Sequence, residues 1–227
     1  GDDSRGEYIY KFVSDAKWDA KDINGGYAAG DKYMNAGKLY VAKFNNDGTG
    51  QWIELAFGKN GLNQSNSVYP FSSQADVVTF ARLAADAVGA TKMDRPEWIA
   101  GAPTGEMYVT LTNNTQRGTT GKAGTDKANP TVKNTYGHII RWKDANDHRG
   151  GTFTWEVFAL AKDVTDAGGQ MFGSPDGIWV DPDNRVFVQT DGEQPGRQND
   201  QMLVANATTR EFKRLFTGVK GCEVTGV

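Results

Sequence analysis

Apolar and polar residues alternate along several short segments of the chain, and polar turns separate these segments. Residues 37–57, 138–161 and 201–217 each read as a strand, a polar turn and a second strand, rich in aromatic and β-branched side chains. Period-two alternation bounded by turn residues is typical of half-buried β-strands. The first turn contains the strong signal Asn-Asp-Gly at 46–48. The pattern therefore predicts three β-hairpins.

A second repeated unit precedes two of these hairpins. Residues 95–110 and 174–190 both place an acid soon after a proline, then an apolar strand, a turn that contains proline, and a second strand that ends in Thr. The segment 221–227 resembles the start of a third copy. One such unit and one hairpin together make a four-stranded blade, so the repeat predicts an all-β fold, a β-propeller. A β-sandwich is the alternative, but it gives no reason for an acid to recur at one point of each unit.

One segment departs from the strand pattern and predicts a helical insertion over residues 73–88. Ser73 and Asp76 resemble a capping box, and Gly89 fits the position after the helix end. The apolar residues between them share one helical face: Val77, Phe80, Ala84 and Val88. We expect this helix at the mouth of the propeller channel.

The remaining segments add two loops and no domain boundary. Residues 118–130 are rich in Gly, Thr, Asn and Lys and predict an exposed loop, and residues 181–184 predict a hairpin turn. We therefore expect residues 1–227 to form a single β-propeller region.

Composition and charge exclude several classes of function. The chain of 227 residues carries 25 basic and 28 acidic residues, for a net charge of −3, and no basic stripe stands out. We therefore expect no nucleic acid binding. No apolar run approaches the ~18 residues of a membrane span, so we expect no membrane-spanning segment. The chain opens on polar residues and shows no signal peptide. We expect a monomer.

Cysteine and histidine are too scarce for a zinc enzyme of the usual kinds. Cys222 is the one cysteine, and His138 and His148 are the two histidines. Cys222 reads most simply as a small buried residue. A metal site in this chain would need oxygen ligands.

Three acidic residues take the same place in the repeated unit. Glu97, Asp176 and Glu223 each stand at the start of the innermost strand of a predicted blade. Innermost strands of a propeller surround a common channel, so we expect these side chains to converge. Converging carboxylates repel one another unless a cation neutralises them. They are therefore candidate metal ligands, although a turn or capping role is the plainer alternative for each, above all for Asp176 in Pro-Asp-Gly.

Arg95 lies two residues before Glu97 and is a candidate phosphate ligand. Its guanidinium offers paired donors that fit a phosphate, and it keeps its charge at alkaline pH. A salt bridge to Asp94 or Glu97 is the alternative.

Two further positions are candidates on weaker grounds. Asn113 and Asn114 follow a predicted strand and can donate to a bound anion or simply form a turn. Asp191 follows the second strand of its unit and can bind a second cation or cap a turn. Other catalytic signatures are missing: the sequence has no G-x-S-x-G, no G-x-x-x-x-G-K-[ST] and no H-E-x-x-H.

At these same residues the sequence resembles the PhoX family of alkaline phosphatases. The matching stretches run in order over nearly the whole chain: EYIYKFVS (7–14), TKMDRPEW (91–98), YVTLTNNT (108–115), YGHIIRW (136–142), FGSPDG (172–177), QTDG (189–192) and GCEVTG (221–226). The family's chain is much longer, so this one resembles its later part, about half to two-thirds of a six-bladed propeller.

The resemblance implies a phosphomonoester hydrolase that works outside the cytoplasm, periplasmic or secreted, after twin-arginine export. It implies a carboxylate-bound cluster of calcium and iron that binds phosphate and activates an oxide or hydroxide nucleophile. Arg95 and Glu97 are the expected catalytic residues, and Arg95 and Asn114 the expected substrate contacts. The expected metal ligands are Glu97, Asp176, Asp191 and Glu223.

Two other functions fit the same scaffold. Calcium-dependent lactonases also place acids and Asn at the inner strand ends of a propeller. A non-catalytic binding propeller would bind no iron and hydrolyse neither a phosphomonoester nor a lactone.

Overall fold

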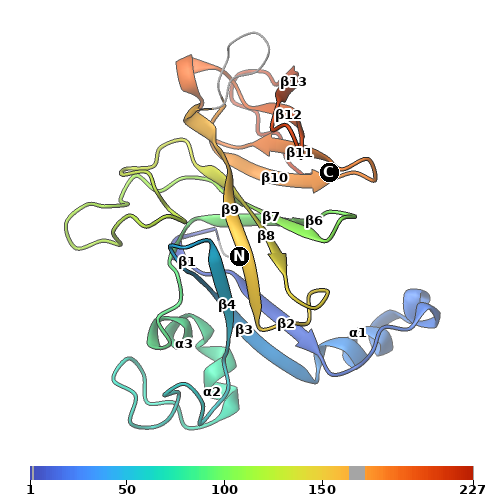
Figure 1. The fold of residues 1–227 in the computed structure, drawn as a ribbon, viewed down its shortest axis with the longest axis vertical. Coiled ribbons are helices and arrows are strands. Elements are labelled where there is room, and N and C mark those ends of the chain that lie inside the picture. Colours follow the sequence, from blue (N-terminus) through green and yellow to red (C-terminus); the bar gives the residue numbers. More distant parts are fainter. Residues whose placement is uncertain (2, 164–171, 227) are drawn as a thin grey trace. The chain divides into compact units, whose positions relative to one another are not determined.

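A computed structural model describes residues 1, 3–163 and 172–226, and its chain clusters into two compact units (Figure 1). The larger unit contains Gly1–Ile9, Phe44–Gly50 and Lys92–Val227. The smaller unit contains Tyr10–Lys43 and Gln51–Thr91. Each unit is described by itself below.

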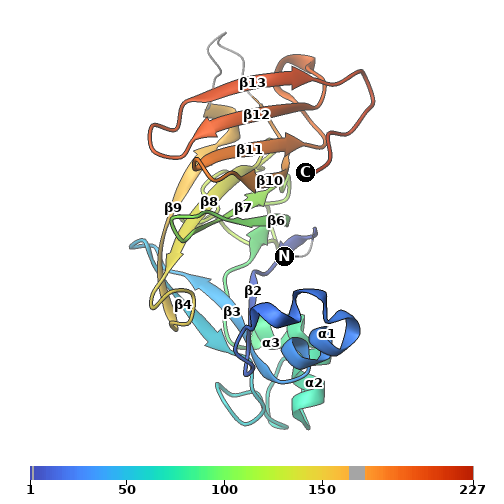
Figure 2. The same ribbon diagram turned by 90° about the vertical axis from the view of Figure 1, so that its right-hand side faces the viewer.

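The larger unit contains two four-stranded antiparallel meanders (Figure 2). The strands of the first are β6 (Pro96–Gly101), β7 (Glu106–Leu111), β8 (His138–Asp144) and β9 (Thr152–Leu160). Those of the second are β10 (Pro175–Val180), β11 (Arg185–Thr190), β12 (Gln201–Asn206) and β13 (Phe212–Thr217). Neighbouring strands in each meander are consecutive in sequence, which is the order of a propeller blade and not of a Greek-key sandwich. The predicted combination of acidic unit and hairpin is confirmed in both, and the fold is a partial, propeller-like all-β fold.

The predicted turns and the loop have the expected character. Asp181 N donates to Arg185 O (3.0 Å) and Asn184 has a φ of 63°, which closes the hairpin between β10 and β11. No helix or strand forms within residues 118–130, and most of their side chains are exposed. Asn129 near the end of this loop is buried, however, and so is Arg117 directly before the loop. The segment 221–227 resembled the start of a third copy, and its described residues, 221–226, form no strand.

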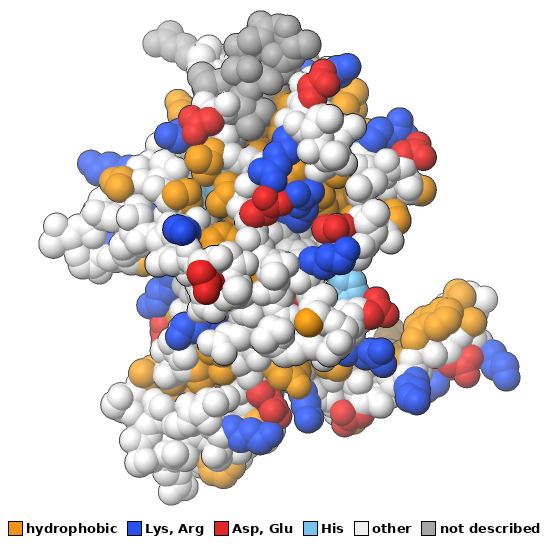
Figure 3. Space-filling view, in the orientation of Figure 1, with side chains coloured by type: hydrophobic (Ala, Val, Ile, Leu, Met, Phe, Trp, Pro, Cys, Tyr) orange, Lys and Arg blue, Asp and Glu red, His pale blue; other side chains and the backbone are white. Residues whose placement is uncertain are grey.

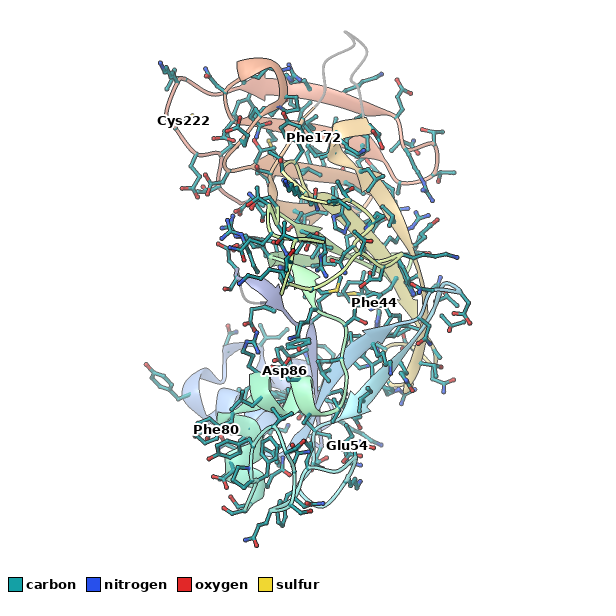
Figure 4. All side chains as sticks on the ribbon, turned by 90° about the vertical axis from the view of Figure 1, so that its left-hand side faces the viewer. Phe44, Glu54, Phe80, Asp86, Phe172 and Cys222 are labelled. Atoms are coloured by element: carbon teal, nitrogen blue, oxygen red, sulfur yellow. The ribbon has the colours of Figure 1, made fainter. Side chains whose placement is uncertain are left out.

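Aromatic side chains fill the core between the two meanders. Phe172 stacks on Phe212 with ring centroids 5.4 Å apart, and Tyr108 meets Phe158 edge-on at 5.2 Å (Figure 4 labels Phe172). Ile139 and the β-branched residues of β10 and β11 complete the cluster. Each such ring removes a large apolar area from water, so this cluster stabilises the larger unit.

The turn between β3 (Gly37–Phe44) and β4 (Thr49–Glu54) also belongs to the larger unit. Trp155 on β9 donates from its backbone N to Gly48 O (2.8 Å) and from its indole Nε1 to Thr49 O (2.8 Å). Gly48 has a φ of 86°, which confirms the predicted Asn-Asp-Gly turn. A short two-stranded sheet of β1 (Arg5–Glu7) and β5 (Met93–Asp94) pairs Arg5 with Asp94. Two short 3₁₀ helices also lie in this unit. The first, η2 (Ala161–Asp163), follows β9, and the second, η3 (Pro195–Arg197), lies between β11 and β12.

The smaller unit combines strands with helices. Strand β2 (Tyr10–Ser14) pairs antiparallel with β3, from Tyr10 opposite Val41 to Ser14 opposite Gly37. The predicted helix over 73–88 forms as two pieces, α2 (Gln74–Thr79) and α3 (Ala81–Ala87), because Phe80 leaves helical geometry at φ −105° and ψ 38°. The predicted cap is confirmed, since Asp76 N donates to Ser73 Oγ (3.1 Å).

Two helices of the smaller unit were missed by the sequence pattern. They are η1 (Ala20–Asn24) and α1 (Gly26–Met34). Neither buries a residue, so no apolar stripe marks them in the sequence. Asp22 helps to hold them, because Lys32 Nζ and Tyr33 Oη both donate to its Oδ2 (2.6 and 2.5 Å).

Two surface properties bear on the expected partners. Basic and acidic side chains are interspersed over the face that Figure 3 displays. Among the helices within the described residues, none is long and apolar enough to cross a membrane.

Candidate functional site

The two inner strands of the larger unit begin with the same backbone feature. Arg95 has a φ of 53° and Ser174 a φ of 49°, and a proline follows each of them. A left-handed conformation costs a side-chain-bearing residue on the order of 1–3 kcal/mol, and the residue before proline is driven toward extended backbone. Such strain persists only where surrounding contacts hold it, and it is common at functional sites. The repeat seen in the sequence is therefore also a repeat of backbone geometry.

A bulge follows each of these turns and carries the acid. The register of β6 against β7 shifts between Pro96 and Ile99, and that of β10 against β11 shifts between Pro175 and Ile178. Bulges re-aim side chains locally and are frequent beside active sites. Glu97 and Asp176 lie inside these irregular stretches. Thr110 Oγ1 joins the two strands, because it donates to the backbone O of Asp176 (2.5 Å) and accepts from Trp98 N (3.1 Å).

Glu97 is a partly buried carboxyl group in a repulsive environment. Burial, followed by the negative charges of Asp3 and Asp176, raises the pKa of Glu97 to about 7, against an opposing effect of Arg95. Its Oε2 atom is buried and makes no hydrogen bond to the described residues. An unpartnered buried carboxylate oxygen is costly unless something positive meets it.

Asp176 shares this environment. Burial, then the charges of Asp191, Asp3 and Glu223, raise the pKa of Asp176 to about 6, and Arg95 again opposes the rise. Asp191 and Glu223 are themselves exposed. Asp176 therefore interacts electrostatically with Glu97, Asp191 and Glu223, and these four carboxylates are called the acidic cluster below. The repeat predicted that Glu97, Asp176 and Glu223 converge, whereas Asp191 was a separate candidate outside that repeat.

Arg95 forms a different ion pair from the two considered in the sequence. Its Nη2 lies 2.5 Å from Asp3 Oδ2, and its Nη1 lies 3.4 Å from Asn113 Oδ1. Neither Asp94 nor Glu97 is its salt-bridge partner among the described contacts. Asp3 was missed because it precedes the first strand and belongs to no repeat, so only the folded chain brings it to Arg95.

Asn114 lies away from the acidic cluster in a buried network. Its Nδ2 donates to Asp94 Oδ1 (2.8 Å) and its backbone N donates to Asn134 O (2.6 Å). Its neighbour Asn113 is the residue that contacts Arg95. Cys222, expected to be buried, is half-buried and free (Figure 4).

The acidic cluster fits a hard cation in its chemistry. No group of three or more His, Cys, Asp or Glu side chains in the described residues already has the arrangement of a metal site. The donor set nevertheless consists of carboxylates, two of which have raised pKa values because of burial and mutual repulsion. Oxygen ligands of this kind suit Ca²⁺ and other hard cations, and a cation would remove the repulsion. Glu97 Oε2 supplies a buried acceptor that a cation would satisfy.

Comparisons with known proteins identify the family of this chain. A family model described as "Alkaline phosphatase PhoX" matches residues 1–227. Among solved structures, Pseudomonas fluorescens PhoX in complex with vanadate, a transition state analogue, is similar at 41% sequence identity and a TM-score of 0.86. The match covers 100% of this chain and 42% of that one, so the chain spans less than half the length of that relative. A search of curated proteins gave no match. Because the family match extends over all of its residues, this chain belongs to the PhoX alkaline phosphatase family.

Proposed function

We propose that the full-length protein is a phosphomonoester hydrolase and that the acidic cluster around Arg95 forms part of its active site. One observation carries the proposal: two equivalent bulged strands bring Glu97 and Asp176 together beside the positive charge of Arg95. The vanadate bound by the related Pseudomonas fluorescens protein is an oxyanion, which supports an oxyanion site in this family.

Arg95 is the proposed phosphate contact. A guanidinium has five N–H donors in a planar fork, so Arg95 can keep Asp3 and Asn113 and still donate to phosphate oxygens. Its charge survives at alkaline pH, where a lysine begins to titrate. Arg95 would hold the phosphate and favour the more highly charged transition state. Asn114 reaches the substrate only through its neighbours, since its own amide is bound to Asp94.

Calcium and iron are the cations we propose for the full-length protein, with Glu97, Asp176, Asp191 and Glu223 as ligands from this part of the chain. A cation there would offset the charge of the phosphate and supply an activated oxygen nucleophile. The protein's own contribution is to hold the carboxylates close together before the cation binds. Glu97 does this from a partly buried position where water competes weakly for its oxygen.

Export beyond the cytoplasm, which the family resemblance implies, completes the proposal. We also propose a monomer and, because the sequence shows no domain boundary, a single propeller region over residues 1–227.

The test assays the purified full-length protein on an aryl phosphate and on a lactone, each with added calcium, together with metal analysis. We expect phosphate ester hydrolysis alone, and bound iron and calcium. Lactone hydrolysis without phosphatase activity would favour the lactonase alternative, and neither activity would favour a binding propeller.

Matched variants then tie the activity to this cluster. Glu97→Gln and Asp176→Asn should each lower both metal content and activity. Asp181→Asn is the control, because Asp181 lies just beyond the other end of β10 and binds Arg185 (Nε to Oδ2, 2.6 Å). Full metal content and activity in both Glu97→Gln and Asp176→Asn would overturn the assignment of the site.

A further inference from the structure

Asp94, the residue directly before Arg95, sits at the centre of a buried polar network. Its Oδ1 accepts from Arg117 Nε (2.7 Å) and Asn114 Nδ2 (2.8 Å), and its Oδ2 accepts from Asn134 Nδ2 (3.0 Å). The Asp94 side chain is 0% exposed and that of Arg117 is 1% exposed. This carboxylate is therefore fully removed from water and fully partnered.

Arg117 uses its remaining donors to tie two segments of the larger unit together. Its Nη2 donates to the backbone O of Lys92 (2.8 Å), and its Nη1 donates to the backbone O of Gly124 (2.9 Å). Asn129 Nδ2 also donates to Lys92 O (3.1 Å). The loop between β7 and β8 is thus fastened to the residues that immediately precede Arg95.

The backbone of Arg95 needs such a support. Its left-handed φ of 53° directly before a proline is unfavourable for an isolated chain. The preceding residue, Asp94, is held by its side-chain network and by the antiparallel pairing of its strand with β1, where it lies opposite Arg5. On the other side Thr112 N donates to Arg95 O (3.1 Å). The ion pair and this hydrogen bond therefore hold Arg95 from both sides.

The buried ion pair between Asp94 and Arg117 serves to fix the backbone geometry around it. A buried ion pair is often no more stabilising than well-packed apolar residues, so stability alone does not require one here. Its directional contacts do specify one backbone arrangement, as polar groups in buried positions do in several systems.

We propose that Asp94 and Arg117 are positioning residues of the phosphatase site. Their ion pair holds the strained turn at Arg95 so that its guanidinium and the carboxylate of Glu97 enter the acidic cluster together. The kinetic part of this inference rests on the proposed function, whereas its geometric part does not.

The geometric test measures hydrogen exchange of the Thr112 amide in the full-length protein. Asp94→Asn should speed this exchange at least tenfold, because the acceptor Arg95 O is no longer held in place. Asp181→Asn, the same change at a carboxylate that also binds an arginine, should leave Thr112 exchange unchanged. Equal protection of Thr112 in Asp94→Asn and in the wild type would overturn the proposal. If Asp94→Asn does not fold, Arg117→Lys takes its place, since it keeps the charge and loses the paired contacts.

The kinetic test asks whether the ion pair acts through Arg95. Asp94→Asn should lower kcat/KM for an aryl phosphate by about 10- to 100-fold, the usual effect of losing an outer-shell partner, and weaken inhibition by inorganic phosphate in parallel. In an Arg95→Lys background, Asp94→Asn should lower kcat/KM by a further factor of less than about three, because the effects of residues that act as a unit are not additive. Losses that multiply in full would overturn the proposal. A wild-type protein without phosphatase activity would instead sink the proposed function, and Thr112 exchange would still decide the positioning role.

Discussion

Asp94 ends β5 and Glu97 lies near the start of β6, only three residues later, yet the two acids have opposite surroundings. Asp94 is fully buried and accepts hydrogen bonds from Arg117 and two asparagines. Glu97 is partly buried, interacts with other carboxylates and leaves a buried oxygen unpartnered within the described structure. We therefore assign Asp94 to the scaffold, and we propose that the unpartnered Oε2 of Glu97 is available to a ligand. The two acids differ both in burial and in how fully their oxygens are hydrogen-bonded.

The largest expected effect is on stability at the scaffold acid. Asp94→Asn should lower the free energy of unfolding by about 3–5 kcal/mol, because it leaves the buried charge of Arg117 without its partner. Urea denaturation of the full-length protein measures this loss. Asp181→Asn should cost less, since Arg185 is exposed and water can solvate it. Comparable losses in both variants would erase the distinction between a buried scaffold pair and an ordinary surface one.

The next effect concerns activity at the site. Arg95→Lys should lower kcat/KM for an aryl phosphate by roughly 30- to 1000-fold, or about 2–4 kcal/mol, because lysine keeps the charge and loses the planar fork. Thermal stability should change little. Arg185→Lys, at an exposed ion pair, is the control and should keep full activity. A fall in melting temperature that accounts for the lost activity would place Arg95 with the scaffold.

The scaffold network should also be sensitive to acid. His138 is fully buried, with Nε2 2.7 Å from Ala128 O and Nδ1 3.1 Å from Asn134 Nδ2, and burial lowers its pKa. As the pH falls, His138 therefore binds a proton more readily in the unfolded chain than in the folded one. This contribution to stability is complete above the unfolded pKa of about 6.5 and is lost as the pH falls, by at most about 1.4 kcal/mol per pH unit.

Unfolding free energies of the wild type and His138→Gln between pH 7 and pH 5 measure this term. The pH dependence should be shallower in the variant. Identical slopes would show that His138 does not titrate on unfolding.

The smallest effect should have the opposite sign to that of Asp94→Asn. In the metal-free protein, Glu97→Gln should raise the free energy of unfolding by about 1 kcal/mol, because it removes a carboxylate that is partly buried and repelled by its neighbours. A thermal melt after metal removal measures it. Glu106→Gln, which removes the partner of Lys143 (3.3 Å), should not stabilise the protein. A destabilised Glu97→Gln variant would mean that Glu97 already has a structural partner.

The sequence predicted those features that repeat. The blades were predictable because the acidic units and hairpins recur with period-two alternation, and Glu97 and Asp176 because they share a place in the repeat. The helix after Ser73 was predictable from its cap, but not its break at Phe80, where the chain leaves helical geometry without a proline or glycine signal.

The rest of the site depends on contacts between distant segments. Asp3 meets Arg95 across 92 positions of sequence, and Arg117 directly precedes the loop 118–130, whose composition indicated only exposure. Neither residue belongs to a repeat or a motif, so local pattern contains no signal for it. Asn114 shows the converse, because its position after a predicted strand suggested a substrate contact, whereas its amide nitrogen donates to Asp94.

A left-handed residue before proline recurs at 95 and 174, but the two turns offer different amounts of space to their side chains. Arg95 is half-buried and its guanidinium pairs with Asp3, whereas Ser174 is fully buried and its Oγ donates to Glu193 O (3.1 Å). For a protein engineer, the turn at 95 therefore accepts a long charged side chain, and the turn at 174 would first need space for one.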